Sequence, residues 1–289
     1  MATPGSLRQS AVLKRLGEDR PLVAVELRPP KSGLSSAQSM DMWIDMYHAI
    51  RRLASGDTIM FLTDNAVGQS EEENLGHLTA NVAGDESPSK FVPFLTSKHT
   101  LDYCLMYAAR AASNGFDALT VLGGDSGAGP PRCVQHAYLL RQRIRERVPS
   151  LALGGWANPH REPAGQVDFL LAPGFEAEFY LTQVVSHHSI RAVERFLTEA
   201  RQRGVPHPGV FGVFLYRSAN PRTLEQLRHF FPVPAEGVTR DFESGLSPEE
   251  VAARTISALR EVGADKVYVS NLGVRQAGER YRRLMEVLT

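Results

Sequence analysis

The chain has 289 residues, of which 43% are hydrophobic and 22% are charged, a composition typical of a globular protein able to bury a large core. Its 32 Lys and Arg residues balance its 32 Asp and Glu residues, so no long-range field favours nucleic acid or an anionic membrane. Residues 1–20 lack the apolar core of a signal peptide and no apolar run could span a bilayer, so we expect a cytoplasmic protein with a small-molecule partner, and a homo-oligomer stays possible.

Short apolar or β-branched runs alternate with longer segments of helical period along the chain, which is typical of repeated βα units. The eight expected strands span residues 22–27, 58–63, 91–96, 117–123, 150–155, 178–184, 209–215 and 265–270. Helices are expected near residues 36–53, 70–82, 99–114, 131–147, 187–203, 221–230, 248–262 and 273–288.

Eight such repeats without a break in composition predict an α/β fold with a single closed barrel. We expect a (β/α)8 TIM barrel over residues 21–289, preceded by a helical extension over residues 1–20. A doubly wound open sheet is the alternative that the pattern leaves open.

Several features of the sequence are given an ordinary structural interpretation. The run Arg141–Arg147 (RQRIRER) predicts the solvated face of a helix, and the widely separated Cys104 and Cys133 predict free thiols. His187 and His188 are adjacent at an expected helix start, where neighbouring side chains point in different directions, and no third ligand has a suitable spacing. We therefore expect no metal site. A hydrolase is a weak alternative, because the GxSxG motif does not occur.

Polar side chains follow most of the expected strands. In (β/α)8 barrels the active site lies at the C-terminal ends of the strands, so these residues are candidates for a site. The candidates are Glu26, Asp64, Thr96, Gly124, Asp125, Trp156, His160, Gln183, Tyr216, Arg217 and Asn271.

Glu26 lies inside the apolar run VAVEL, and the strand period points it into the barrel mouth. Burial should raise the pKa of this carboxyl and keep it protonated near neutral pH, which suits a general acid; an ion pair with Arg28 is an equally supported alternative. Asp125 follows two glycines that let a ligand approach the backbone, so its carboxylate is expected to hydrogen-bond a polar heterocycle. Gln183 offers a donor and an acceptor to the edge of such a ring.

Taken in order, these segments resemble the methylenetetrahydrofolate reductase family over about residues 20–289. VAVELRPPK at 23–31 is similar to the family's SFEFFPPK, VLGGD at 121–125 to ALRGD, and FYLTQ at 179–183 to AITQ. Weaker likenesses are PFLT at 93–96 to PHLT, GVFGVFLYRSAN at 209–220 to PGILPVSN, and VYVSN at 267–271 to FYTLN.

The resemblance implies reduction of 5,10-methylenetetrahydrofolate to 5-methyltetrahydrofolate by hydride from NADH or NADPH. It aligns Glu26 with the catalytic proton donor to N10, Asp125 with the aspartate that serves the flavin and the pterin, and Gln183 with the glutamine that contacts folate. We further expect the substrate to contact Thr96, Tyr216, Arg217 and Asn271, and the cofactor to contact Asp64, Gly124, Trp156 and His160. Lys98, Arg217 and Arg275 are possible anchors for anionic groups.

The departures from the family concentrate where it holds FAD. Phe94 replaces a histidine, Gly123 replaces an arginine, and the segments 156–160 (WANPH) and 168–179 (DFLLAPGFEAEF) contain no Lys or Arg. Each charge-assisted bond lost this way is worth about 1.5–3 kcal/mol, which predicts weak FAD binding or none. Trp156 can still stack on a flavin or a nicotinamide. The alternatives are an FAD-dependent reductase, a methyltetrahydrofolate-oxidising enzyme and a folate-binding homologue without the chemistry.

Overall fold

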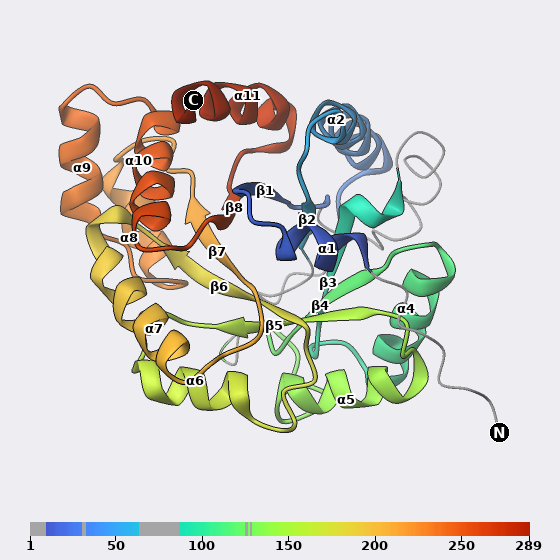
Figure 1. The fold of residues 1–289 in the computed structure, drawn as a ribbon. Helices are drawn as coiled ribbons and strands as arrows, with labels where there is room; N and C mark the ends of the chain where they lie inside the picture. Colours follow the sequence, from blue (N-terminus) through green and yellow to red (C-terminus); the bar gives the residue numbers. More distant parts are fainter. Residues whose placement is uncertain (1–9, 31–32, 64–86, 125–126, 128) are drawn as a thin grey trace.

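The strands form a closed parallel barrel in the computed structural model, which describes residues 10–30, 33–63, 87–124, 127 and 129–289 (Figure 1). Each strand pairs with the next, and β8 returns to β1. The strands are β1 (Leu22–Leu27), β2 (Met60–Leu62), β3 (Phe91–Thr96), β4 (Ala118–Leu122), β5 (Ala152–Ala157), β6 (Phe179–Val185), β7 (Gly209–Phe214) and β8 (Lys266–Ser270). The predicted (β/α)8 TIM barrel is confirmed, and the open sheet is excluded.

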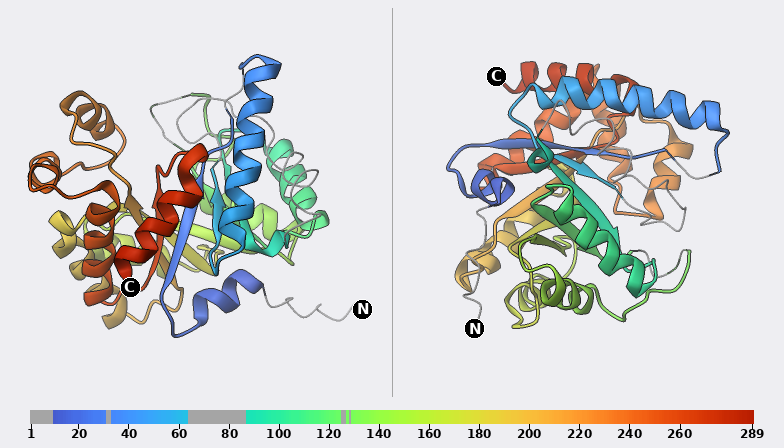
Figure 2. Two further views of the ribbon diagram at one scale, coloured as in Figure 1. Left: turned by 90° about the horizontal axis from the view of Figure 1, so that it is seen from above. Right: turned by 90° about the vertical axis from the view of Figure 1, so that its right-hand side faces the viewer.

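Helices surround the barrel on the outside (Figures 1 and 2). They are α1 (Ala11–Gly17), α2 (Ser36–Ala54), α4 (Leu101–Ser113), α5 (Ala137–Arg147), α6 (Pro163–Leu171), α7 (Ile190–Gln202), α8 (Pro221–Arg228), α9 (Ala235–Glu243), α10 (Pro248–Glu261) and α11 (Ala277–Leu288). Single 3-10 turns are η1 (Pro88–Lys90), η2 (His187–Ser189) and η3 (Val274–Gln276). The sequence pattern did not predict α6 or α9, and the helix expected near residues 70–82 lies outside the described residues.

The inside of the barrel is packed with side chains from alternate strand positions. Phe61 contacts both Phe94 and Tyr268, with ring centroids 6.0 and 5.9 Å apart. Large rings fit because some facing positions are glycines: a Cβ added at Gly154 would lie 2.6 Å from the ring of Phe179. The interior is therefore a solid core and not a pore, as expected for this fold.

Helix α1 covers the N-terminal ends of the strands. Val12 and Leu16 belong to the same buried cluster as the barrel interior. The backbone N–H of Ala11 donates to the Asp117 carboxylate just before β4, at 2.6 Å, and Arg15 donates to the carbonyl of Pro21 just before β1, at 2.7 Å. The described part of the expected N-terminal extension is thus packed into the barrel.

The prediction that the arginines of α5 form a solvated face is wrong for Arg141. This side chain is 4% exposed and donates to the carbonyls of Phe175 and Val121 at 2.8 and 3.1 Å. Desolvation lowers the pKa of the guanidinium to about 10, although Glu176 and Glu178 oppose that shift. These buried backbone carbonyls need a hydrogen-bond donor, and Arg141 supplies it. The side chain therefore fastens α5 to the barrel. The two cysteines are free thiols, as predicted.

Among the described helices, none combines the length and the apolar character that crossing a bilayer requires.

Candidate active site

Four of the predicted site residues lie on strands at or near the C-terminal end of the barrel. Glu26 is on β1, Trp156 on β5 and Gln183 on β6, while Thr96 is the last residue of β3. Strand alternation puts Glu26 on the same side of β1 as Ala24, which belongs to the interior cluster, and Trp156 packs partly buried against that cluster. Asp64 and Asp125 lie outside the described residues, so their predicted roles stay predictions.

Glu26 is a half-buried carboxyl on an apolar strand, paired in register with Phe61 of β2. Desolvation raises its pKa to about 7, and the opposing effect of Arg28 is smaller. Among the described residues it makes no side-chain hydrogen bond. The pKa of the buried Tyr268 is raised by burial and also by the charge of Glu26, so the phenol and the carboxyl are electrostatically coupled.

Of the two interpretations that the sequence left open for Glu26, this balance favours the proton donor over the ion pair with Arg28. Desolvation outweighs the Arg28 charge, so the carboxyl holds its proton to about neutral pH. A carboxyl with a pKa near the working pH can both give and regain a proton, which is the property required of a general acid.

Cationic side chains hold the loop after β4: Lys98 connects it to the loop after β3, and Arg132 forms a hydrogen bond within it. Lys98 donates to the carbonyl of Pro130 at 3.0 Å, and Arg132 donates to the carbonyl of Gly124 at 2.5 Å. Gly124 has a positive φ of 70°, and a Cβ there would lie 2.8 Å from Lys98 Cγ, so only glycine fits without displacing the lysine. Arg132 was not predicted, because nothing in the sequence places it next to Gly124.

The β5–α6 loop is held by hydrogen bonds within itself and to β6. His160 Nε2 lies 2.9 Å from the carbonyl of Val184, and the Asn158 side chain accepts from the His160 backbone N–H at 3.0 Å. Gln183 accepts from the Val184 backbone N–H and its amide donates to the carbonyl of Phe230 at 3.4 Å. The structure thus brings His160 and Gln183 to the same strand end.

The predicted substrate contacts after β7 and β8 connect those two strands. Arg217 donates to the backbone carbonyl of Asn271 at 3.0 Å and to its side-chain oxygen at 3.1 Å. Asn271, with a positive φ of 67°, donates to the carbonyl of Leu215 at 2.9 Å. Tyr216 is 6% exposed and packs with Leu224 of α8 and Val238 of α9, so its ring faces these helices.

Two further polar side chains, those of Arg275 and Thr120, were not predicted as the structure has them. Arg275, a predicted anion anchor, pairs instead with Asp45 of α2 at 2.7 Å. Thr120 on β4 was not predicted; it is fully buried, and its hydroxyl oxygen has no hydrogen-bond partner among the described residues. Buried polar atoms usually find a partner, so Thr120 is a buried polar group whose hydroxyl is unsatisfied within the described residues.

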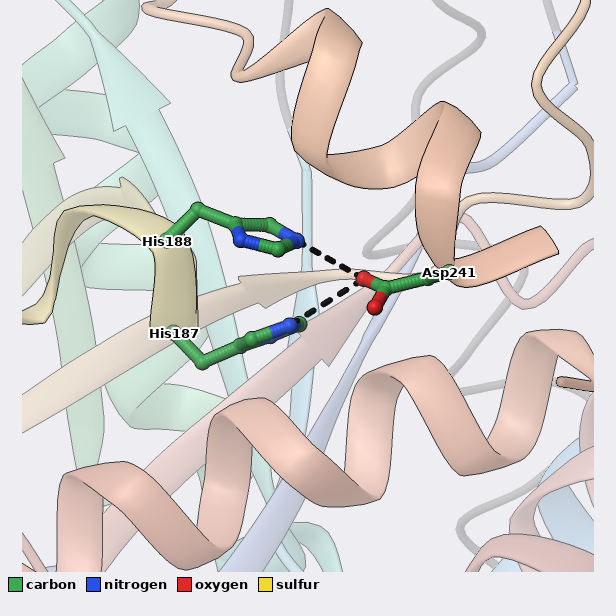
Figure 3. Close-up of side chains that lie close together, drawn as sticks. All are labelled: His187, His188 and Asp241. Carbon is green, nitrogen blue, oxygen red and sulfur yellow. Dashed lines mark hydrogen bonds and ion pairs between the residues drawn. The ribbon is translucent and has the colours of Figure 1, made fainter. Parts of the chain in front are cut away.

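The sequence analysis also missed a cluster beside the end of β6. His187 and His188 on η2 both turn toward Asp241 on α9 (Figure 3). Their Nε2 atoms lie 3.1 and 2.8 Å from Asp241 Oδ2, and the two rings are 3.9 Å apart. The expectation that neighbouring histidines diverge is wrong here, because residues 187–189 form a 3-10 turn and the third side chain comes from an unpredicted helix.

The start of α6 follows the strand after which the resembled family binds the phosphates of FAD. A helix N-terminus attracts anions, but here both carboxylate oxygens of Glu162 accept from the Ala164 and Gly165 backbone N–H groups, at 2.9 and 2.6 Å. Within residues 156–179 the one cation is Arg161, which directly precedes that glutamate. An acid already occupies the anion-binding position, so these residues do not fit the diphosphate.

No protein-family model and no curated protein matches the sequence. Solved structures do match. An uncharacterized protein from Clostridium thermocellum, which binds two copies of 5-methyl-5,6,7,8-tetrahydrofolic acid, has a TM-score of 0.64 and 15% identity, covering 93% of this chain and 98% of that chain. An F420-dependent secondary alcohol dehydrogenase in complex with an F420-acetone adduct has a TM-score of 0.55 and 10% identity, covering 93% and 99%. At these identities the likeness shows the barrel fold alone.

Proposed function

We propose that the chain is a folate-binding oxidoreductase that reduces 5,10-methylenetetrahydrofolate to 5-methyltetrahydrofolate with hydride from NADH or NADPH. The observation that carries this proposal is Glu26, a carboxyl in the barrel mouth whose pKa desolvation raises to about 7. The motifs shared with methylenetetrahydrofolate reductase and the methyltetrahydrofolate bound by a protein of the same fold support the choice of substrate.

The reaction needs one proton and one hydride. Protonation of N10 breaks its bond to the methylene carbon and leaves an iminium at N5, and hydride from the nicotinamide then adds to that carbon to give the methyl group. Glu26 supplies the proton to N10 and regains one from solvent, so the carboxyl ends each cycle as it began.

Other groups of the barrel mouth bind and orient the substrate. The amide of Gln183 is held by the Val184 backbone and Phe230, which presents a fixed polar edge to the pterin. Trp156 supplies an aromatic surface for stacking. Asp125, assigned through the family resemblance, stabilises the positive charge of the iminium.

Hydride passes directly from the nicotinamide to the folate in this proposal, without tightly bound FAD. The support is the Glu162 carboxylate at the start of α6 and the lack of Lys or Arg in that helix. An FAD-containing reductase is the rival within the same reaction.

Two measurements on freshly desalted protein test the proposal. We expect no visible flavin absorption, and we expect NADH or NADPH to be oxidised on addition of methylenetetrahydrofolate, with methyltetrahydrofolate identified by mass spectrometry. Stoichiometric flavin that survives desalting would refute the flavin-free route. Absence of turnover with either nucleotide, with or without added FAD, would refute the reductase.

A folate-binding protein without turnover is the second candidate, favoured by the bound methyltetrahydrofolate of the structural neighbour. Calorimetric titration with methyltetrahydrofolate separates the two functions. Binding without nucleotide oxidation in either direction would support the binding protein, whereas oxidation of methyltetrahydrofolate by NAD+ would indicate an enzyme that runs in reverse.

A further inference from the structure

The cluster of His187, His188 and Asp241 places two imidazole nitrogens and one carboxylate oxygen around a single point. The atoms lie within 4.8 Å of one another, and Asp241 is only 6% exposed (Figure 3). Within the described part of the chain, this is the group of three whose side chains could hold a metal ion. It lies apart from Glu26, on a different strand end.

The contacts of Thr255 favour one tautomer of His187. The Thr255 hydroxyl lies 3.3 Å from the carbonyl of Val251, to which it can donate its one proton, and 2.9 Å from His187 Nδ1, toward which it then acts as acceptor. In this arrangement the ring proton sits on Nδ1, and Nε2 of the neutral ring carries a lone pair.

That lone pair faces a negative charge. His187 Nε2 is buried without a hydrogen-bond partner among the described residues, and it lies 3.1 Å from Asp241 Oδ2. The geometry calls for a cation between the nitrogen and the carboxylate.

We propose that His187, His188 and Asp241 bind a divalent transition-metal ion, with zinc as the first candidate. Neutral imidazole nitrogens with one carboxylate suit zinc, whereas magnesium and calcium prefer oxygen ligands alone. Ligand atoms about 2.0–2.1 Å from a tetrahedral ion stand roughly 3.3 Å apart, so the 3.1 and 2.8 Å separations need to widen by only a few tenths of an ångström. Three protein ligands leave the fourth position to water.

Two neighbours tune this site. Thr255 holds the imidazole of His187 in the metal-binding tautomer, the usual task of a residue behind a histidine ligand. Arg254 lies 3.4 Å from Asp241 Oδ1, and its charge opposes a second cation nearby. The metal should therefore bind more weakly with Arg254 present than without it.

The bound ion would connect α9 to the end of β6. Gly237 allows the close approach, since a Cβ there would lie 2.5 Å from the ring of His188. Between β7 and α10 the chain otherwise packs through a small apolar cluster that contains Tyr216, Leu224 and Val238. A metal cross-link would add a fixed polar contact between these segments.

The test is zinc binding to the full chain with any affinity tag removed. Protein stripped with a chelator and then titrated against a chromogenic zinc indicator should bind one equivalent per chain. Asp241→Asn and His188→Asn should each weaken binding by at least about 100-fold, and Thr255→Val by roughly 10- to 100-fold. Arg254→Gln should tighten binding. His229→Asn, at the exposed end of α8, is the matched control and should leave binding unchanged.

A second measurement on the wild-type chain does not depend on the folding of variants. Zinc should protect His188 from carbethoxylation, mapped by mass spectrometry, while His229 reacts equally with and without the metal. Failure to bind one equivalent, binding that survives both ligand substitutions in folded protein, or no protection of His188 would each overturn the proposal.

Discussion

Glu26 and Asp241 are two carboxyl groups beside strand ends of one barrel, and their surroundings differ in kind. Glu26 is adjacent to apolar rings, has no side-chain hydrogen bond among the described residues, and has a pKa raised to about 7. Asp241 contacts two histidines and an arginine. Desolvation without a partner makes a proton carrier, whereas a carboxylate with several partners holds segments together.

The first prediction tests the role of Glu26 as the proton donor. Glu26→Gln keeps the shape of the side chain but cannot protonate N10, so kcat should fall by about 10²- to 10⁴-fold while KM changes little. Steady-state kinetics with methylenetetrahydrofolate and NADH measures the effect. A variant that turns over at the wild-type rate would remove Glu26 from the chemistry.

The second prediction concerns the apolar surroundings of that carboxyl. Phe61 is fully buried, and Phe61→Ala should cost about 3–5 kcal/mol of unfolding free energy through the cavity it leaves. Water entering the cavity should also lower the pKa of Glu26 toward its ordinary value, which would move the pH–rate profile to lower pH. Urea unfolding and that profile are the measurements. Phe169 is 61% exposed, so Phe169→Ala is the control. It should change neither the unfolding free energy nor the pH–rate profile by much.

The third prediction is a pH dependence of stability that Glu26 causes. Its folded pKa of about 7 exceeds the ordinary value of 4.5, so the folded state binds more protons between those values. The contribution of Glu26 to stability is therefore present below pH 4.5 and is lost as the pH rises through 7, by on the order of 2–3 kcal/mol.

Glu26→Gln should abolish this loss, so the variant gains stability relative to wild type between pH 5 and pH 8. Urea unfolding of both proteins at the two pH values gives the difference. Parallel stability curves for the two proteins would show that the Glu26 pKa is not raised by folding.

The fourth prediction is that neutralising Asp241 lowers the stability of the protein, whereas neutralising Glu26 raises it. Asp241→Asn leaves His188 and Arg254 without their charged acceptor, and it should lower the unfolding free energy by about 1–3 kcal/mol at pH 8. Hydrogen exchange should accelerate most in α9. Asp168→Asn, which loses only an exposed pair with Arg203, should change stability by less than about 1 kcal/mol. Equal effects of the two substitutions would contradict the role given to Asp241.

The barrel was predictable because its signal is local. Strand period placed Glu26 inward, and β1 and β3 begin and end at the predicted residues. Strand ends elsewhere moved by one or two residues because the ladder, and not the side-chain pattern, decides where pairing stops. The predicted β2 span of residues 58–63, for example, narrows to Met60–Leu62.

Contacts between distant segments were not predictable in the same way. Asp241 lies 53 residues from His188, on a short helix whose start at Ala235 follows a proline and carries no side-chain cap. Arg141 had the composition of an exposed face, yet two carbonyls from other elements required its guanidinium. No period or motif in one sequence records such pairings.

Helix α1 has a practical consequence for handling the protein. It covers the N-terminal ends of the strands, whereas the candidate site lies at their C-terminal ends. A tether joined directly to the start of α1 would therefore leave from the end of the barrel opposite the candidate site, which suits surface-based titration of the folate and nucleotide that we propose as ligands.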